Sequence, residues 1–192
     1  TSCGAGKNLV TADKAPIKVG IDLINVKEDK VLVTLDPGAF TSENVTFYIP
    51  KTVPGTYSTD NYGKYIENFK AFDFKGVEMT VSKSDENTWN IANGKNLDRV
   101  SYYVNDTYDS ESEQEHAVFS PAGTNILKGE NFMLNLHGFV GYFKDLIEVP
   151  YELVIMHPSN LKATTSLKLK ATKDVKATEA KTKIINNDVN FG

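Results

Sequence analysis

The sequence predicts an all-β domain, an antiparallel β-sandwich with one or two short helical turns. Three observations lead to this prediction. Apolar and polar residues alternate over many short segments, as they do in half-buried strands. Turn residues such as Gly, Pro, Asn and Asp interrupt these segments at short intervals. No segment shows the longer periodicity of an amphipathic helix, so two packed sheets are the expected way to bury the apolar faces.

The first half of the chain alternates clearly between turn signals. Residues 17–23 alternate, residues 26–30 form a connection, and a return strand at 31–35 stops at Asp36-Pro-Gly. Residues 65–74 alternate imperfectly, which predicts a strand with an irregularity. Strands are expected over residues 17–23, 31–35, 45–49, 65–74, 77–82, 88–91, 100–104, 131–136, 149–157 and 166–172.

Other segments of the chain predict turns, loops and tails. Residues 121–127 and 139–146 are each compact enough for a single helical turn, and the acidic stretch 105–115 predicts a solvated loop. Residues 1–14 predict a flexible leader and residues 15–172 the β-sandwich. Residues 173–192 are polar and predict a tail or an edge strand.

Composition narrows the functional classes. The 192 residues are 40% hydrophobic, which is enough to build a core at this size. The formal net charge is −4 and the lysines are scattered, so no basic face for nucleic acid is expected. No run approaches the roughly 18 apolar residues of a transmembrane helix. Any attachment to a membrane is therefore expected only through a lipid anchor.

The single cysteine, Cys3, stands near the start of the sequence in Thr-Ser-Cys-Gly-Ala-Gly-Lys. Small residues before a Cys and a Gly-rich run after it resemble the end of a bacterial lipoprotein signal, in which the Cys carries the lipid. On this interpretation Cys3 is lipidated and the protein is anchored in the bacterial cell envelope, in the periplasm or outer membrane. The alternative is an incidental thiol near an arbitrary start of the sequence.

A tyrosine-rich loop is the most distinctive local feature. Pro54-Gly55 predicts a turn, and Tyr57 and Tyr62 follow in polar surroundings that do not require them. Tyrosine combines a large apolar ring with a polar tip, which suits a surface that binds or packs. Pro54, Gly55, Tyr57 and Tyr62 are therefore candidates for an interface or for substrate access. Tyr142, in a compact aromatic segment, joins them.

Histidines, acids and nucleophiles form no recognised catalytic pattern. His116, His137 and His157 are widely separated and lack the spacing of a zinc motif on a helix. The acidic stretch 105–115 lacks the Gly that a calcium loop needs at its sharp turn. No catalytic, cofactor-binding or metal-binding residue is predicted. His137, beside Gly138, is the best candidate for a functional histidine, with a packed or turn-capping role as the alternative.

Several segments together resemble the N-terminal domain of the glycyl aminopeptidase family, which are zinc metallopeptidases with a PDZ domain. The first segment is Thr52-Val-Pro-Gly-Thr-Tyr57, followed by Ile66-Glu-Asn-Phe-Lys-Ala-Phe72 and Gly76. The second runs from Phe119-Ser-Pro-Ala-Gly through Asn131-Phe-Met-Leu-Asn-Leu-His-Gly-Phe to Pro150-Tyr-Glu-Leu. The order and spacing of these segments agree over most of residues 16–170.

The resemblance implies a non-catalytic domain that supports a catalytic domain and shapes substrate access. The family's His-Glu-x-x-His motif is absent from this sequence, so zinc is expected in a catalytic domain beyond residue 192. The implied partners are the protein's own catalytic and PDZ domains and, indirectly, a peptide substrate. Whether the chain by itself belongs to an enzyme stays open.

Two other functions remain open at this point. The first is a stand-alone cell-envelope lipoprotein module that binds peptide or glycan through the Tyr57/Tyr62 loop. The second is a purely structural envelope or adhesion domain. The sequence downstream of residue 192 distinguishes the peptidase-domain interpretation from both, since a His-Glu-x-x-His motif there indicates a peptidase.

Overall fold

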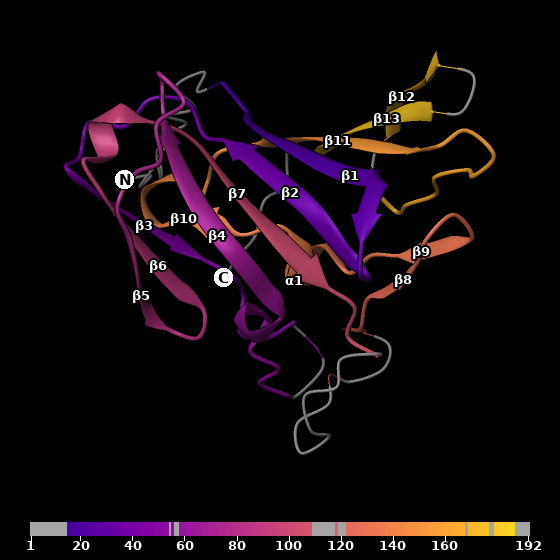
Figure 1. Cartoon of the computed structure of the whole chain (residues 1–192), viewed down its shortest axis with the longest axis horizontal. Coiled ribbons are helices and arrows are strands. Elements are labelled where there is room, and N and C mark those ends of the chain that lie inside the picture. Colours follow the sequence, from indigo (N-terminus) through magenta and orange to yellow (C-terminus); the bar gives the residue numbers. More distant parts are fainter. Residues whose placement is uncertain are drawn as a thin grey trace, which may run out of the picture.

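The computed structural model describes residues 15–53, 55, 58–108, 118, 122–167, 169–176 and 179–186. In this part of the chain, a large twisted sheet packs against a smaller sheet, and a separate hairpin lies beside them (Figure 1). The buried apolar residues of both sheets form one continuous core. The predicted all-β sandwich is confirmed.

The larger sheet has seven strands in the order β12-β13-β11-β1-β2-β7-β4. Its strands are β1 (Ile17–Lys27), β2 (Lys30–Asp36), β4 (Ile66–Asp73), β7 (Leu97–Asn105), β11 (Tyr151–Pro158), β12 (Leu169–Lys176) and β13 (Glu179–Asn186). In β2 and β11, and over most of β1 and β7, every second residue is buried, because alternate side chains of a strand point to opposite faces.

The smaller sheet has four strands in the order β10-β3-β6-β5. Its strands are β3 (Asn44–Tyr48), β5 (Val81–Asp85), β6 (Thr88–Ala92) and β10 (Tyr142–Phe143). Strand β5 begins later than the predicted strand at 77–82, because Val77 is 60% exposed and Glu78 only forms an isolated bridge with Phe72. All pairs in this sheet are antiparallel.

One strand pair departs from the predicted antiparallel arrangement. Strands β1 and β11 run parallel, with Ile17 opposite Tyr151 and Ile21 opposite Ile155. The two strands are far apart in sequence, and a parallel pair needs a long crossover instead of a hairpin. The alternation of apolar and polar residues does not reveal the relative direction of two strands, because it is the same in a parallel and in an antiparallel pair.

Aromatic rings fill the space between the two sheets. The Phe47 ring, fully buried on β3, lies 5.0 Å from Phe143, 5.1 Å from Phe69 and 5.7 Å from Tyr102 between ring centroids. Phe69 also stacks on Trp89 at 5.0 Å with an interplanar angle of 21°. These rings come from both sheets and hold them together.

The irregularity predicted within 65–74 is a bulge in β4. The pairing register with β7 shifts between Glu67 and Lys70, and Asn68 has a positive φ of 51°. A bulge inserts an unpaired residue and redirects the side chains around it. Here Phe69 packs between Trp89 and Tyr102 as a result.

The predicted helical turns are partly wrong. Asn125–Leu127, inside the segment predicted as one turn, is strand β8, which pairs with β9 (Asn131–Met133) through a tight turn at Gly129. The α-helical turn is α1 (Leu136–Phe139), earlier than predicted. Three 3₁₀ turns complete the described elements, η1 (Tyr62–Tyr65), η2 (Gly94–Asn96) and η5 (Lys144–Leu146).

The polar segment near the end of the sequence is an inner part of the large sheet. Strand β13 pairs with β11 on one side and with β12 on the other, so β12 forms the edge. Ile184 and Thr182 of β13 are buried. This strand has few large apolar residues, and its inner position comes with backbone pairing to both β11 and β12.

Replacing Phe47 by Ala should lower the free energy of unfolding by about 3–5 kcal/mol, because the change leaves a cavity among fully buried rings. Urea unfolding followed by circular dichroism measures this value. The matched control is Phe74→Ala, at a ring that is 61% exposed, for which a change within about 0.5 kcal/mol is expected. Equal losses for the two variants would contradict the assignment of the aromatic core.

Candidate functional site

The Pro-Gly loop begins shortly after the end of β3. Gly55 has a φ of +92°, a conformation that only glycine adopts without strain. Pro54 and Tyr57 lie outside the described residues. The backbone amides of Asp60 and Asn61 both donate to the carbonyl oxygen of Lys51 at 2.8 Å. The loop therefore leaves and re-enters the domain at one closed base.

Tyr62 lies beneath this loop, inside the domain. Its side chain is 1% exposed, and its hydroxyl has two acceptors in reach, Ala122 O at 3.1 Å and Asp60 Oδ2 at 3.3 Å. Burial, and then the charge of Asp60, raises the pKa of the Tyr62 hydroxyl well above its usual value of 10.0. The prediction that Tyr62 offers a ligand-binding surface is wrong, because the ring is an anchor in the core.

A buried polar network connects Tyr62 to three segments of the chain. Asp60 is 3% exposed, and its Oδ1 accepts a hydrogen bond from Ser58 Oγ at 2.6 Å. The Asn135 side-chain amide donates to Ala122 O and lies 3.4 Å from the Tyr62 hydroxyl. A buried carboxylate must be hydrogen-bonded, so the network fixes the loop base against residues 122 and 135.

His137 lies on α1, next to Tyr62 through its neighbour Gly138. Asn135 caps this helical turn, because its side-chain oxygen accepts from the His137 amide at 3.2 Å. A Cβ at Gly138 would come within 2.8 Å of the Tyr62 ring, so only glycine permits this packing. Burial lowers the pKa of the half-buried His137 below 6.5, which favours the neutral imidazole. The structure thus brings the segments of two predicted residues, Tyr62 and His137, together.

Tyr142 occupies a different surface, the outer side of the four-stranded sheet. It is opposite Tyr48 in the β10–β3 pair, and the two ring centroids are 5.3 Å apart. Their neighbours Phe47 and Phe143 point into the core, so the alternation of the strands directs both tyrosines outward. Burial and then the neighbouring Tyr48 raise the pKa of Tyr142 above 10.0.

Uncharged polar side chains surround this tyrosine pair. Thr46 Oγ1 lies 3.2 Å from Asn90 Oδ1, and the Asn90 amide donates to Ser84 Oγ. We call the outward side chains of the four strands the tyrosine face. The tyrosine face consists of Asn44, Thr46, Tyr48, Ser82, Ser84, Asp85, Thr88, Asn90, Ala92 and Tyr142.

Charge is almost absent from the tyrosine face. Its single charged residue is Asp85, at the turn between β5 and β6. The Asn87 amide, at 2.8 Å, and the Thr88 hydroxyl donate to this carboxylate and hold its pKa below 3.8. By contrast, the outer side of the large sheet carries ion pairs such as Lys30–Glu67 at 3.0 Å and Lys183–Glu152 at 2.7 Å. The two outer surfaces of the sandwich therefore differ in chemistry.

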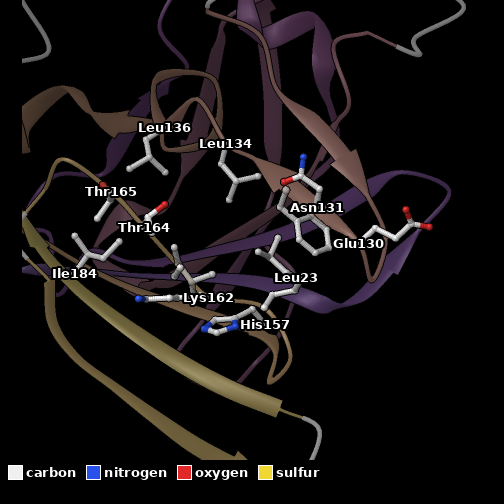
Figure 2. Close-up of a pocket in the computed structure, with 14 residues that line it drawn as sticks. Leu23, Glu130, Asn131, Leu134, Leu136, His157, Lys162, Thr164, Thr165 and Ile184 are labelled. Carbon is white, nitrogen blue, oxygen red and sulfur yellow. The ribbon is translucent and has the colours of Figure 1, made fainter.

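A pocket of about 250 Å³ lies at the other end of the molecule, beneath the β8–β9 hairpin (Figure 2). Its floor is the inner side of strands β1, β11 and β13, and its walls are the hairpin and residues 161–165. Apolar residues lining it are Leu23, Phe132, Leu134, Leu136, Ile155, Leu161, Ala163 and Ile184. Polar residues lining it are Glu130, Asn131, His157, Lys162, Thr164 and Thr165.

His157 lies in the floor of this pocket and is 3% exposed. Its Nε2 is 2.9 Å from Thr182 Oγ1, and its Nδ1 is 3.0 Å from Pro158 O. Both ring nitrogens thus have partners, and the imidazole is fixed in position. His116 lies outside the described residues.

Neither a metal cluster nor a membrane-spanning helix was found in the described residues. No three His, Cys, Asp or Glu side chains among them are grouped so that they could hold a metal ion. None of the helices in this part of the chain is long and apolar enough to cross a membrane. Cys3 lies outside the described residues.

Sequence reasoning missed several residues of these surfaces. Tyr48 carried a usable signal, since it alternates with the apolar Val45 and Phe47 and therefore points outward. Asp60 and Asn135 gave no signal, because a buried polar network depends on which distant segments meet. The same is true of Lys162 and Thr164, whose contribution to a pocket requires the hairpin above them.

Comparisons with known proteins give a family and a structural likeness. A model described as the peptidase M61 N-terminal domain matches residues 18–183. An aminopeptidase N family protein from Idiomarina loihiensis superposes with a TM-score of 0.68 at 19% identity, over 90% of this chain and 27% of that chain. An M1 zinc metallopeptidase from Deinococcus radiodurans gives a TM-score of 0.47 at 10% identity, over 88% of this chain and 37% of that chain. No curated protein matches.

Replacing Tyr62 by Phe should lower the free energy of unfolding by about 1–2 kcal/mol, because buried acceptors at Asp60 and Ala122 lose a donor. Thermal and urea unfolding of the chain measure the loss. The matched control is Tyr103→Phe, at a half-exposed position on β7, for which almost no change is expected. A Tyr62→Phe variant as stable as the original chain would contradict the role of the network.

Proposed function

Because this chain belongs to the family of peptidase M61 N-terminal domains, we propose that it is the non-catalytic β domain of a zinc aminopeptidase-like protein. Its function is to support a catalytic domain and to shape the access of peptides to that domain. The chain spans 27% of the length of the Idiomarina structure with the same fold, which leaves ample room for a catalytic domain in such a protein. Zinc would be held by that catalytic domain, and a PDZ domain would complete the protein.

The observation that carries this proposal is the chemistry of the tyrosine face. Interface cores are enriched in tyrosine and depleted of Lys, Glu and Asp. A surface that stays in water usually carries interspersed charges, as the outer side of the large sheet does here. The tyrosine face has two paired tyrosines and one charge, which is held in its own turn. It therefore has the composition of a surface that packs against another domain.

The base of the Pro-Gly loop follows β3, the strand that carries Tyr48. This base is closed on Lys51 and anchored by the buried Asp60–Tyr62 network. A loop with a rigid base and a tyrosine-rich sequence suits the rim of a substrate entrance. We assign substrate access to Pro54, Gly55 and Tyr57 of this loop, with Tyr62 as its anchor.

The alternative is a stand-alone module that binds peptide or glycan through this loop. The burial of the Tyr62 ring does not favour this alternative.

The proposed localisation rests on the sequence pattern alone. The small residues around Cys3 support a lipid anchor there, and hence a place in the bacterial cell envelope.

The first test replaces both tyrosines of the pair in the full-length protein, as Tyr48→Ser with Tyr142→Ser. Loss of two interface aromatics should destabilise the full-length protein by about 2–4 kcal/mol. The same double change in this chain alone should cost about 1 kcal/mol, the value of a half-buried aromatic pair. Urea unfolding of both proteins measures the difference.

The matched control for the double variant is Tyr103→Ser, which lies on the outer side of the large sheet and should affect the two proteins equally. Equal losses for the double variant in the chain alone and in the full-length protein would overturn the assignment of the tyrosine face as the interface.

The second test addresses substrate access through Tyr57→Ala in the full-length protein. Removal of an aromatic contact to bound peptide should raise KM about fivefold and leave kcat nearly unchanged, because uniform binding is lost. Steady-state peptide hydrolysis measures both constants, with Tyr103→Ala as the control. If stability and turnover both stay at their original values, the loop does not shape access.

A further inference from the structure

The pocket beneath the β8–β9 hairpin is separate from the surfaces used in the proposed function. In Figure 1 this hairpin and strands β3, β5 and β6 lie at opposite ends of the molecule. No residue that lines the pocket belongs to the tyrosine face or to the Pro-Gly loop. A ligand in this pocket would therefore contact none of the residues on which the proposed function rests.

The shape and lining of the pocket define the body of its ligand. Leu and Ile supply six of the fourteen lining residues, and Phe132 and Ala163 add to the apolar part of the lining. A volume of about 250 Å³ is many times the roughly 10–15 Å³ that one water molecule requires, so the pocket has room for a chain of several carbon atoms. An aliphatic chain of medium length fits this space.

The charge at the rim defines the head of the ligand. Lys162 is exposed, and in the described part of the chain its ammonium group has no ion-pair partner. Figure 2 shows the Lys162 side chain among the labelled residues of the pocket, whereas the Glu130 carboxylate extends away from them. The hydroxyl groups of Thr164 and Thr165 lie on the same wall segment as Lys162.

We propose that this pocket binds a medium-chain aliphatic carboxylate. The aliphatic chain of this ligand lies on the floor formed by Leu23, Ile155 and Ile184, beneath the leucines of the hairpin side. The carboxylate accepts hydrogen bonds from Lys162 and the threonine hydroxyls at the rim. The buried imidazole of His157, fixed through Thr182 and Pro158, forms part of the floor and makes no bond to the carboxylate.

Calorimetric titration of this chain with octanoate tests the proposal. Octanoate should bind, and butanoate should bind far more weakly, since each buried CH₂ group changes affinity about fourfold. Octanamide, which has the same chain without the charge, should bind about two to five times more weakly than octanoate at low salt. High salt should remove most of this difference.

Two variants connect the binding to the pocket. Lys162→Met should weaken octanoate about two- to fivefold and leave octanamide unchanged, whereas Lys128→Met, at an exposed lysine in the hairpin turn, should change neither. Thr164→Trp should block the pocket and abolish binding of both. Residues 162 and 164 are both exposed, so their substitution should not disturb the fold. Unchanged thermal unfolding of the two variants checks this.

The same titrations can overturn the proposal. It fails if octanoate does not bind, if butanoate or octanamide binds as tightly as octanoate, or if Thr164→Trp leaves the affinity unchanged. It also fails if an N-acetylated dipeptide ending in leucine binds more tightly than octanoate, because the pocket would then recognise peptide ends. None of these outcomes depends on the tyrosine face or on peptide turnover, so the proposed function is tested separately.

Discussion

The packing of Phe47 against rings from both sheets is the contact on which the rest of the structure depends. Phe47 lies on β3, and the same strand presents Tyr48 to the opposite side, because neighbouring side chains of a strand point in opposite directions. The core therefore sets the orientation of the tyrosine face. The bulge at Asn68 serves the same packing, since it directs Phe69 between Trp89 and Tyr102. A core of interlocking rings leaves β3 little freedom to slip, and slippage by one residue would exchange its two faces.

The polar network beneath the Pro-Gly loop fixes the base of the loop, just as the aromatic rings hold the two sheets together. Asp60 and Tyr62 are buried with partners from the neighbouring Ser58 and from Ala122 and Asn135, which are distant in the sequence. Removing one partner from a buried polar group costs more than the bond contributed, so such a network holds its segments together. The network therefore fixes the base of the loop, which suits the proposed role of the loop in substrate access.

Much of the fold could be predicted from the sequence, because burial imposes a period of two on each strand. The structure confirms the strands predicted at residues 17–23 and 31–35 and the irregularity predicted within residues 65–74. The family model confirms the resemblance to a peptidase N-terminal domain. The parallel pairing of β1 with β11 could not be predicted, since direction leaves no mark on alternation. The burial of Tyr62 could not be predicted either. A tyrosine in a polar loop is expected to be exposed unless its buried acceptors, here Asp60 and Ala122, are known. The pocket was invisible because its lining comes from five separate segments.

The inner side of the large sheet has two different covers, and this asymmetry explains why the pocket lies where it does. The four-stranded sheet covers β2, β7 and β4 with large rings that fill the gap between layers. Strands β11 and β13 are covered by the two-stranded β8–β9 hairpin, which pairs with no other strand in the described part of the chain. Such a hairpin is only marginally stable alone, so its position depends on inward contacts such as those of the buried Ile126. Its narrow inner side, with Phe132, cannot fill the space beneath it. An aliphatic group in that space would contact hairpin and sheet at once, and binding would therefore also stabilise the hairpin against the sheet.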